Sequence, residues 1–377
     1  MSQLDNYEVA HCIGCGAELQ SETEDKAGFV PSSVLNKPTE ELTDIYCKRC
    51  FRLRHYNEVS DVELTDDDFL TMLNEISSKD ALVVNVIDIV DFNGSLISGM
   101  QRFAGKNPLI IVGNKTDLLP KAIGEGRIRQ WMTERVEEVG LRPLEVILTS
   151  ALNKDSVQEL MTKIEKLRKG RDVYIVGSTN VGKSTIINQI INIATDSPDV
   201  ITTSYFPGTT LGSIEIPLDD GQAIIDTPGI ILRSNMTNSL SKQDLKKVIP
   251  RREIKPVVYQ LEEKQTVFLG GLARFDYEKG PGKQGIVFYK SNEIGLHRTK
   301  LEKADEIYEN HVGELLTPPS EVDKDHKPTL VKHSFTVKQP SDIVVSGLGW
   351  VSVHQTPANV SMWAPEEIGV YIRKAII

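Results

Sequence analysis

The chain has 377 residues, of which 40% are hydrophobic and 25% are charged, and its formal net charge is −10 at pH 7. This length allows two or three domains with cores of their own. The net charge excludes a uniformly cationic surface, but local basic patches remain compatible with it because screened charges act over about 8–10 Å. No apolar run reaches the ~20 residues of a membrane-spanning helix, and the polar start predicts no signal peptide and a cytoplasmic protein.

All four cysteines stand in two C-x-x-C pairs, Cys12 with Cys15 and Cys47 with Cys50. Two such pairs separated by a longer loop are the arrangement in which four thiolates hold tetrahedral zinc. A reducing compartment favours metal over disulfides, and a redox pair or free thiols is the alternative. Four thiolates leave no open coordination position, so we expect a structural Zn²⁺ in a finger over residues 1–60.

The end of this finger, residues 47–57, interleaves lysine and arginine with Phe51 and Tyr56. Such a composition suits contacts with a phosphate backbone together with base stacking. The alternative is a solvated face whose aromatic rings pack the finger itself. A capped helix with an apolar side is expected next, over residues 65–76.

Short hydrophobic strands then alternate with helical segments. Strands are predicted at 81–90, 109–112, 145–148 and 172–176, with two more flanking 219–222. Alternation of this kind predicts an α/β domain, over residues 61–235, whose sheet is mainly parallel with helices on both faces. Asp88 and Asp91 near the end of the first strand are expected to cap it; metal carboxylates are the alternative.

Asn114-Lys115-Thr116-Asp117, which we call the guanine-specificity motif, follows the second of these strands. The Asp117 carboxylate can accept N–H bonds from guanine N1 and N2, whereas adenine offers no such donor pair and would leave the carboxylate unpaired. Asn114 and Lys115 are expected to brace the base and the phosphate-binding loop. Ser150-Ala151 follows the third strand, and we expect the Ala151 N–H to meet guanine O6.

Residues 177–184 have the P-loop pattern G-x-x-x-x-G-K-S between the fourth strand and a helix. Its two glycines let successive N–H groups point at phosphate oxygens, Lys183 places a charge on the β- and γ-phosphates, and Ser184 offers a hydroxyl to Mg²⁺. The nucleotide contacts predicted in this segment are those of Gly177, Asn180, Val181, Gly182, Lys183, Ser184 and Thr185.

A Thr-, Ser-, Pro- and Gly-rich stretch at 202–210 has the composition of a mobile switch, in which a threonine hydroxyl closes on Mg²⁺ when γ-phosphate is present. A strand then ends in the D-x-x-G motif of residues 226–229. We expect Asp226 to hold Mg²⁺ through water and the Gly229 N–H to contact the γ-phosphate. Ile230 follows, where Ras-like enzymes use Gln to orient the attacking water, so hydrolysis is expected to be slow or to use another group.

The remaining residues, 236–377, predict an α+β domain with a substantial antiparallel sheet. A short helix at 241–249 ends at Pro250 and is followed by a basic cluster of Arg251, Arg252 and Lys255. Strands are predicted at 265–269, 284–289, 329–331, 341–345 and 349–353, and a capped helix at 299–310.

The guanine-specificity motif precedes the P-loop, whereas the usual small GTPase has the opposite order. In this order the chain resembles the circularly permuted GTPases, and with its two cysteine pairs it is similar to the YqeH type. The resemblance implies binding of GTP and GDP, hydrolysis of GTP to GDP and phosphate, and a role in assembly of the small (30S) ribosomal subunit, with that subunit or its precursor and its rRNA as partners. It also implies K⁺ bound near Asn180, where an arginine finger would otherwise place its charge; the alternative is that Asn180 only shapes the loop.

For the switch threonine, the resemblance favours Thr210 as Mg²⁺ ligand, with Thr209 as the alternative. The catalytic set that it implies is Lys183, Asn180, Thr210 and Gly229. Two other hypotheses remain open: a scaffold in which GTP is a static ligand, and a GTPase subunit of another RNA-processing system. Because D-x-x-G ends the permuted domain, the second switch is expected to lead directly into the C-terminal domain, which is expected to bind RNA or the ribosome.

Overall fold

The computed structural model describes residues 10–12, 17–24, 26, 28–35, 45–48, 50–52, 71, 74–196, 208–209, 214–320 and 328–376. The chain forms two compact units. The first contains Met1–Asp88, Leu96–Lys115 and Met132–Ile231, and the second contains Ile89–Ser95, Thr116–Trp131 and Leu232–Ile377. Two short segments from the middle of the sequence therefore belong with the C-terminal unit.

A seven-stranded sheet, in the order β3-β2-β1-β4-β7-β6-β5, forms the centre of the first unit. The first five strands in this order are parallel, and β6 and β5 are antiparallel additions at one edge. The mainly parallel sheet predicted from the alternating pattern is confirmed. The strands are β1 Ala81–Asp88, β2 Leu109–Asn114, β3 Glu145–Leu148, β4 Asp172–Gly177, β5 Gly208–Thr209, β6 Ile214–Pro217 and β7 Ala223–Asp226.

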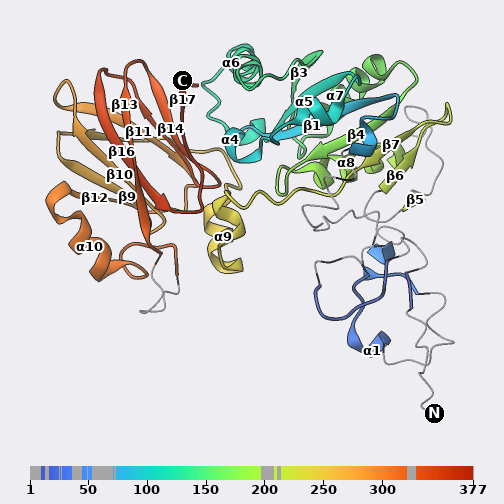
Figure 1. The fold of residues 1–377 in the computed structure, drawn as a ribbon, viewed down its shortest axis with the longest axis horizontal. Helices are drawn as coiled ribbons and strands as arrows, with labels where there is room; N and C mark the ends of the chain where they lie inside the picture. The colour runs from blue at the N-terminus through green and yellow to red at the C-terminus, as the bar shows by residue number, and fades with distance from the viewer. Residues whose placement is uncertain are drawn as a thin grey trace. The chain divides into compact units, whose positions relative to one another are not determined.

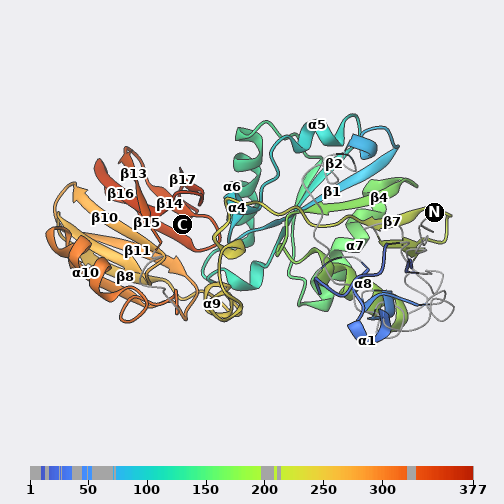
Figure 2. The same ribbon diagram turned by 60° about the horizontal axis from the view of Figure 1, so that its bottom comes forward.

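Helices cover both faces of this sheet, with α7 and α8 on one face and α5 on the other (Figure 2). Because both faces are covered, the central strands are almost continuously hydrophobic rather than alternating. One core cluster joins Val157 and Ile164 of α7, Ile187 of α8 and Val84 of β1. The helices are α5 Met100–Ala104, α6 Glu125–Glu138, α7 Lys154–Arg168 and α8 Lys183–Asp196.

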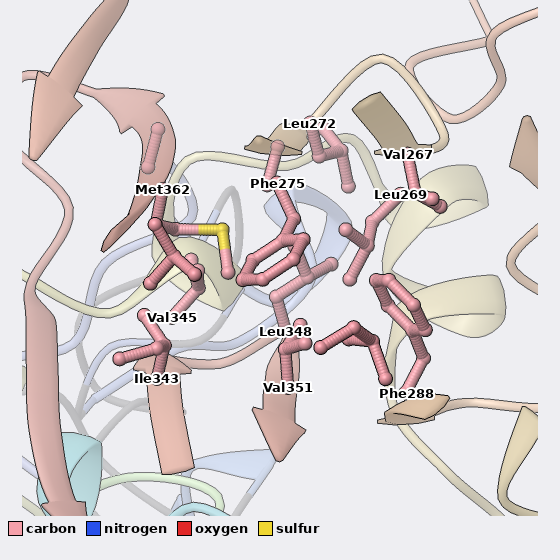
Figure 3. Close-up of a cluster of buried hydrophobic side chains, with 14 of the residues drawn as sticks. Val267, Leu269, Leu272, Phe275, Phe288, Ile343, Val345, Leu348, Val351 and Met362 are labelled. Atoms are coloured by element: carbon pink, nitrogen blue, oxygen red, sulfur yellow. The ribbon is translucent and has the colours of Figure 1, made fainter. Parts of the chain in front are cut away.

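The second unit contains two five-stranded antiparallel sheets, β12-β9-β10-β16-β13 and β17-β14-β15-β11-β8 (Figure 1). Side chains from both sheets share one hydrophobic core, in which Phe275 and Met362 meet Ile343 and Val351 (Figure 3). The strands are β8 Val257–Leu261, β9 Gln265–Leu269, β10 Ala273–Lys279, β11 Gln284–Lys290, β12 Leu296–Lys300, β13 Leu330–Val337, β14 Ser341–Val345, β15 Gly349–Val353, β16 Ala358–Pro365 and β17 Val370–Lys374.

The short helix predicted at 241–249 is present as α9, Lys242–Val248, and the Ser241 side chain caps it by accepting from the Asp244 N–H. The helix predicted at 299–310 is wrong at its start. Thr299 belongs to β12 and pairs with Thr266, and α10 begins only at Ala304 after a 3₁₀ turn, with no side-chain cap. Pairing across the sheet therefore outweighed the local capping pattern.

The other short helical segments lie in the finger, after β1, after β2, after D-x-x-G, and between β12 and α10. They are α1 Ser32–Leu35, α4 Phe92–Ser95, η2 Thr116–Leu118, η3 Met236–Asn238 and η4 Leu301–Lys303. Of the helix predicted at 65–76, the structure describes residues 71 and 74–76 as helical, and the predicted cap lies outside the described residues.

Candidate functional site

The P-loop connects the end of β4 to the start of α8. Asn180 and Gly182 have φ values of +64° and +89°, a conformation in which glycine is unstrained. A Cβ at Gly182 would lie 2.4 Å from the Asn114 Nδ2, and one at Gly177 would lie 2.8 Å from the Val86 carbonyl oxygen. Both glycines are therefore required by close approach of neighbouring groups.

Lys183, the first residue of α8, directs its Nζ to Asp226 Oδ1 at 3.1 Å. The two side chains are only 2% and 4% exposed. Asp226 is the last residue of β7, which lies beside β4, and the carboxyl ends of parallel strands meet at one edge of a sheet. The P-loop lysine and the D-x-x-G carboxylate thus form a buried ion pair beside the N-terminus of α8, which is the end of a helix that favours anions.

The D-x-x-G segment runs along the P-loop through main-chain bonds. The Ile230 N–H donates to the Gly177 carbonyl at 3.3 Å, and the Ile230 carbonyl accepts from the Thr179 N–H at 2.8 Å. A Cβ at Gly229 would lie 3.2 Å from the Thr179 Cγ2. The glycine of D-x-x-G is therefore also a point of close approach.

Asn114, the last residue of β2, is completely buried and connects two loops. Its Nδ2 donates to the Val181 carbonyl of the P-loop at 2.8 Å, across 67 residues of sequence. Its Oδ1 accepts from the Ala151 N–H at 2.9 Å. The Ala151 N–H, which the sequence assigns to guanine O6, thus binds Asn114 in this structure.

Lys115 connects the P-loop to the end of β1. Its Nζ donates to the Asn180 carbonyl and to Asp88 Oδ2, both at 2.6 Å. The Asp88 carboxylate therefore orients the lysine of the guanine-specificity motif. Asp91, in the C-terminal unit, instead accepts from Asn235 Nδ2 at 2.6 Å and from the Gly347 N–H at 2.9 Å. The two carboxylates near the end of β1 thus have different roles, which their sequence positions did not distinguish.

The other predicted residues are placed as follows. Asp117 is exposed and lies in the 3₁₀ turn η2 that follows β2. Ser150 is buried, and its N–H donates to Ser156 Oγ at 3.1 Å, a contact that sequence patterns did not reveal. Ser184 is buried and Thr185 is exposed on the first turn of α8. Thr209 lies in β5, and Thr210 lies outside the described residues.

Three of the four cysteines form a buried cluster. The Sγ atoms of Cys12, Cys47 and Cys50 lie within 4.8 Å of one another, and the Cys47 N–H donates to Cys12 Sγ at 3.1 Å. Cys15 lies outside the described residues. Convergent sulfurs with an N–H···S bond suit thiolate ligation, because the donor stabilises charge on the sulfur; this cluster could hold a metal ion.

Near this cluster, Phe51 is 45% exposed and Arg52 is also exposed. Lys48 pairs with Glu24 and lies 5.9 Å from the centroid of the Phe29 ring. Residues 53–57 of the predicted basic segment lie outside the described residues. In the described part of the chain, no helix combines the length and apolar character that crossing a membrane requires.

Together, the sheet, the P-loop, the D-x-x-G motif and an upstream guanine-specificity motif define the class of circularly permuted GTP-binding proteins. Family models agree: residues 172–268 match "50S ribosome-binding GTPase" and residues 283–376 match "YqeH-like, C-terminal". The chain is 50% identical to the YqeH protein of Bacillus subtilis over 97% of its own length and 99% of the relative's. The chain belongs to the YqeH-like family of circularly permuted GTPases.

More distant similarities extend the comparison. NO-associated protein 1, chloroplastic/mitochondrial, of Arabidopsis thaliana is 31% identical over 92% of this chain and 70% of that protein. Among solved structures, the crystal structure of GNP-bound YlqF from T. maritima matches this chain with a TM-score of 0.32 and 23% sequence identity. The match includes 48% of this chain and 72% of the YlqF chain.

Proposed function

We propose that this protein hydrolyses GTP to GDP and phosphate and acts as a nucleotide-dependent, cytoplasmic factor in assembly of the small ribosomal subunit. The observation that carries the nucleotide part is the position of Asn114, whose amide joins the P-loop to the Ser150-Ala151 loop. A motif that specifies guanine and a loop that binds phosphate are thereby linked directly, although they are distant in sequence and in reversed order.

In the proposed site, backbone N–H groups of the P-loop and the positive end of α8 bind the phosphates. Lys183 contacts the β- and γ-phosphates. The hydroxyls of Ser184 and of a switch threonine, Thr210 or Thr209, would bind Mg²⁺, and Asp226 would hold the ion through water. Gly229 contributes its N–H to the γ-phosphate. The Asp117 carboxylate accepts from guanine N1 and N2.

The attacking water needs a source of transition-state stabilisation other than a glutamine, because Ile230 has no hydrogen-bonding side chain. Asn180 has an exposed side chain, and its carbonyl is bound by Lys115. We propose that the Asn180 side chain helps to bind K⁺ beside the phosphates, where the cation supplies the charge of an arginine finger.

Turnover is accordingly expected to rise in K⁺ relative to Na⁺ at equal ionic strength, because the larger ion gives up its water more readily. Asn180→Ala should remove most of this K⁺ response while changing GTP affinity less, since the interaction strengthens mainly as charge develops in the transition state. Phosphate release under single-turnover conditions measures it, with Asn192→Ala, an exposed residue of α8 outside the predicted nucleotide contacts, as a comparison. Equal wild-type rates in K⁺ and Na⁺ would rule out the cation.

The ribosomal part of the proposal rests on family membership. The family model that matches residues 172–268 is described as a 50S ribosome-binding GTPase, whereas we propose the small subunit and its rRNA as the target. The exposed Phe51 and Arg52 of the finger are suited to contacts with RNA.

Sedimentation with separated subunits tests the target. With a non-hydrolysable GTP analogue, the protein is expected to co-sediment with 30S particles or their precursors and to be released with GDP. Co-sedimentation with 50S particles alone would contradict the choice of subunit. Absence of turnover in K⁺ with and without either subunit would favour a scaffold in which GTP is a static ligand.

We also propose that Cys12, Cys15, Cys47 and Cys50 hold one structural Zn²⁺. The three described sulfurs converge, and the buried residues around them, such as Ala17, Leu19 and Val30, form a very small core that a metal would complete. We expect this zinc to have no catalytic role, because four thiolate ligands leave no coordination position for water or a substrate.

Cys47→Ser is therefore expected to lower the zinc content from about one per chain to near zero and to unfold the finger, while GTP affinity changes less than about threefold. Elemental analysis and nucleotide titration on protein prepared without chelator measure the two effects. Wild-type protein without zinc would contradict the proposal.

A further inference from the structure

We propose that Glu253 and Asn292 are positioning residues that hold the turn carrying Asp117 and so control how long a guanine nucleotide stays bound. The inference rests on the proposed function, because it concerns the same guanine site. All the groups involved, from Thr116 onward, belong to the C-terminal unit of the structure.

Two main-chain N–H groups make hydrogen bonds that join the segment just after the guanine-specificity motif to residues 253 and 254. The Ile254 N–H donates to the Leu118 carbonyl at 2.9 Å, and the Lys121 N–H donates to Glu253 Oε1 at 2.9 Å. Leu118 and Ile254 are 5% and 1% exposed. These bonds fix the backbone from residue 118 to residue 121, and Asp117 is adjacent to the first of them.

Residues 253–255 are in turn held by the side chain of Asn292. Asn292 Nδ2 donates to the Glu253 carbonyl at 2.9 Å, and its Oδ1 accepts from the Lys255 N–H at 2.9 Å. Asn292 lies in the turn between β11 and β12, which belong to different sheets of the C-terminal domain. The Asn292 amide thus bonds to one main-chain carbonyl and one main-chain N–H of residues 253–255, as a neighbouring β-strand would.

The Glu253–Lys121 contact acts through the main chain rather than through charge. The Lys121 ammonium is 4.0 Å from Glu253 Oε2 and its side chain is 88% exposed, so the ion pair contributes little. The Lys121 N–H requires only an acceptor oxygen on the side chain of residue 253. A glutamine at this position keeps that acceptor, and an alanine removes it.

The consequence concerns the orientation of the Asp117 carboxylate. Two N–H groups of guanine bind it, and both bonds require the carboxylate to be held in one orientation. When residues 118–121 lose their anchor, the turn samples other conformations and both bonds weaken. Hypoxanthine offers only the N1–H, so an inosine nucleotide has less to lose than a guanosine nucleotide.

The experiment measures dissociation of ribose-labelled GDP and IDP from the full-length protein by stopped flow. Glu253→Ala and Asn292→Ala are expected to speed GDP release about tenfold, the equivalent of roughly one charge-assisted bond, and to speed IDP release distinctly less. Glu253→Gln is expected to retain the wild-type rates. Matched controls are Lys121→Ala, which removes only the exposed ammonium, and Glu262→Ala, an exposed carboxylate in the same domain.

Unchanged GDP release in both alanine variants would overturn the proposal, and so would equal acceleration of GDP and IDP, which a merely loosened fold would produce. If Asn292→Ala does not fold, Glu253→Ala alone tests the proposal. The Glu253 side chain is 39% exposed, so its truncation is expected to leave the fold intact. Wild-type protein that binds no guanine nucleotide would overturn the proposed function as well, whereas wild-type binding with unaffected variants overturns only this inference.

Discussion

Replacing Lys183 by alanine is expected to abolish measurable GTP binding. The Lys183 side chain lies at the start of α8 and is 2% exposed, so alanine removes a positive charge that the fold holds beside the phosphate-binding loop. A charged donor on the β- and γ-phosphates is a main source of affinity in P-loop proteins. We expect the dissociation constant to rise at least about 100-fold, equivalent to a loss of roughly 3 kcal/mol, as measured by calorimetric titration.

The same substitution is expected to destabilise the protein without ligand, because Asp226 loses the cation 3.1 Å away and is itself 4% exposed. Removal of one partner from a buried ion pair typically costs about 3–5 kcal/mol. The double variant Lys183→Ala/Asp226→Asn removes the uncompensated charge, so its melting temperature should recover while GTP binding remains lost. GTP affinity within tenfold of wild type in either variant would refute the assignment of the P-loop lysine.

Asp117→Asn is expected to change the base preference from guanine to xanthine. In the proposed site the carboxylate accepts from two guanine N–H groups, and the amide of asparagine cannot accept both. Xanthine instead offers an N1–H donor and a C2 carbonyl acceptor, which match an amide. Loss of one of these bonds, and of the negative charge that strengthens the other, predicts that GTP affinity falls by roughly 100- to 10,000-fold, while xanthosine triphosphate gains.

Competition between unlabelled GTP and xanthosine triphosphate for a labelled nucleotide measures this exchange of preference. Thr116→Ala, in the same 3₁₀ turn, is the matched control and should keep the guanine preference. An Asp117→Asn protein that still prefers guanine would show that residues 114–117 do not select the base.

The candidate site could be predicted from sequence because each motif follows a hydrophobic strand of a parallel sheet. The carboxyl ends of such strands meet at one edge, so Asn114, the Ser150-Ala151 loop and the P-loop had to converge. The partner of Lys115 could not be predicted in this way. Asp88 and Asp91 look alike in sequence, and only the three-dimensional arrangement assigns the first to Lys115 and the second to Asn235.

The C-terminal sheets were predicted only in part, and β10 shows one physical cause of a missed strand. β9, β11, β14 and β15 have hydrophobic cores and were recognised, and the strand predicted at 329–331 covers the start of β13. β10 contains Arg274 and Asp276, which look solvent-exposed in sequence but are buried, 2.8 Å apart, beside the indole of Trp363 in β16. Two buried charges that neutralise each other within one strand erase the hydrophobic pattern on which sequence prediction depends.

Two main-chain bonds hold Ile230: its N–H and carbonyl bind Gly177 and Thr179, and neither bond depends on its side chain. Any non-proline residue could keep these two bonds. Under the proposed function, the speed of hydrolysis is therefore separable from the architecture that binds the nucleotide. Substitutions at this single position can therefore change the lifetime of the GTP-bound state during evolution without loss of the nucleotide-binding fold. Isoleucine, which favours slow hydrolysis, is compatible with the same two main-chain bonds.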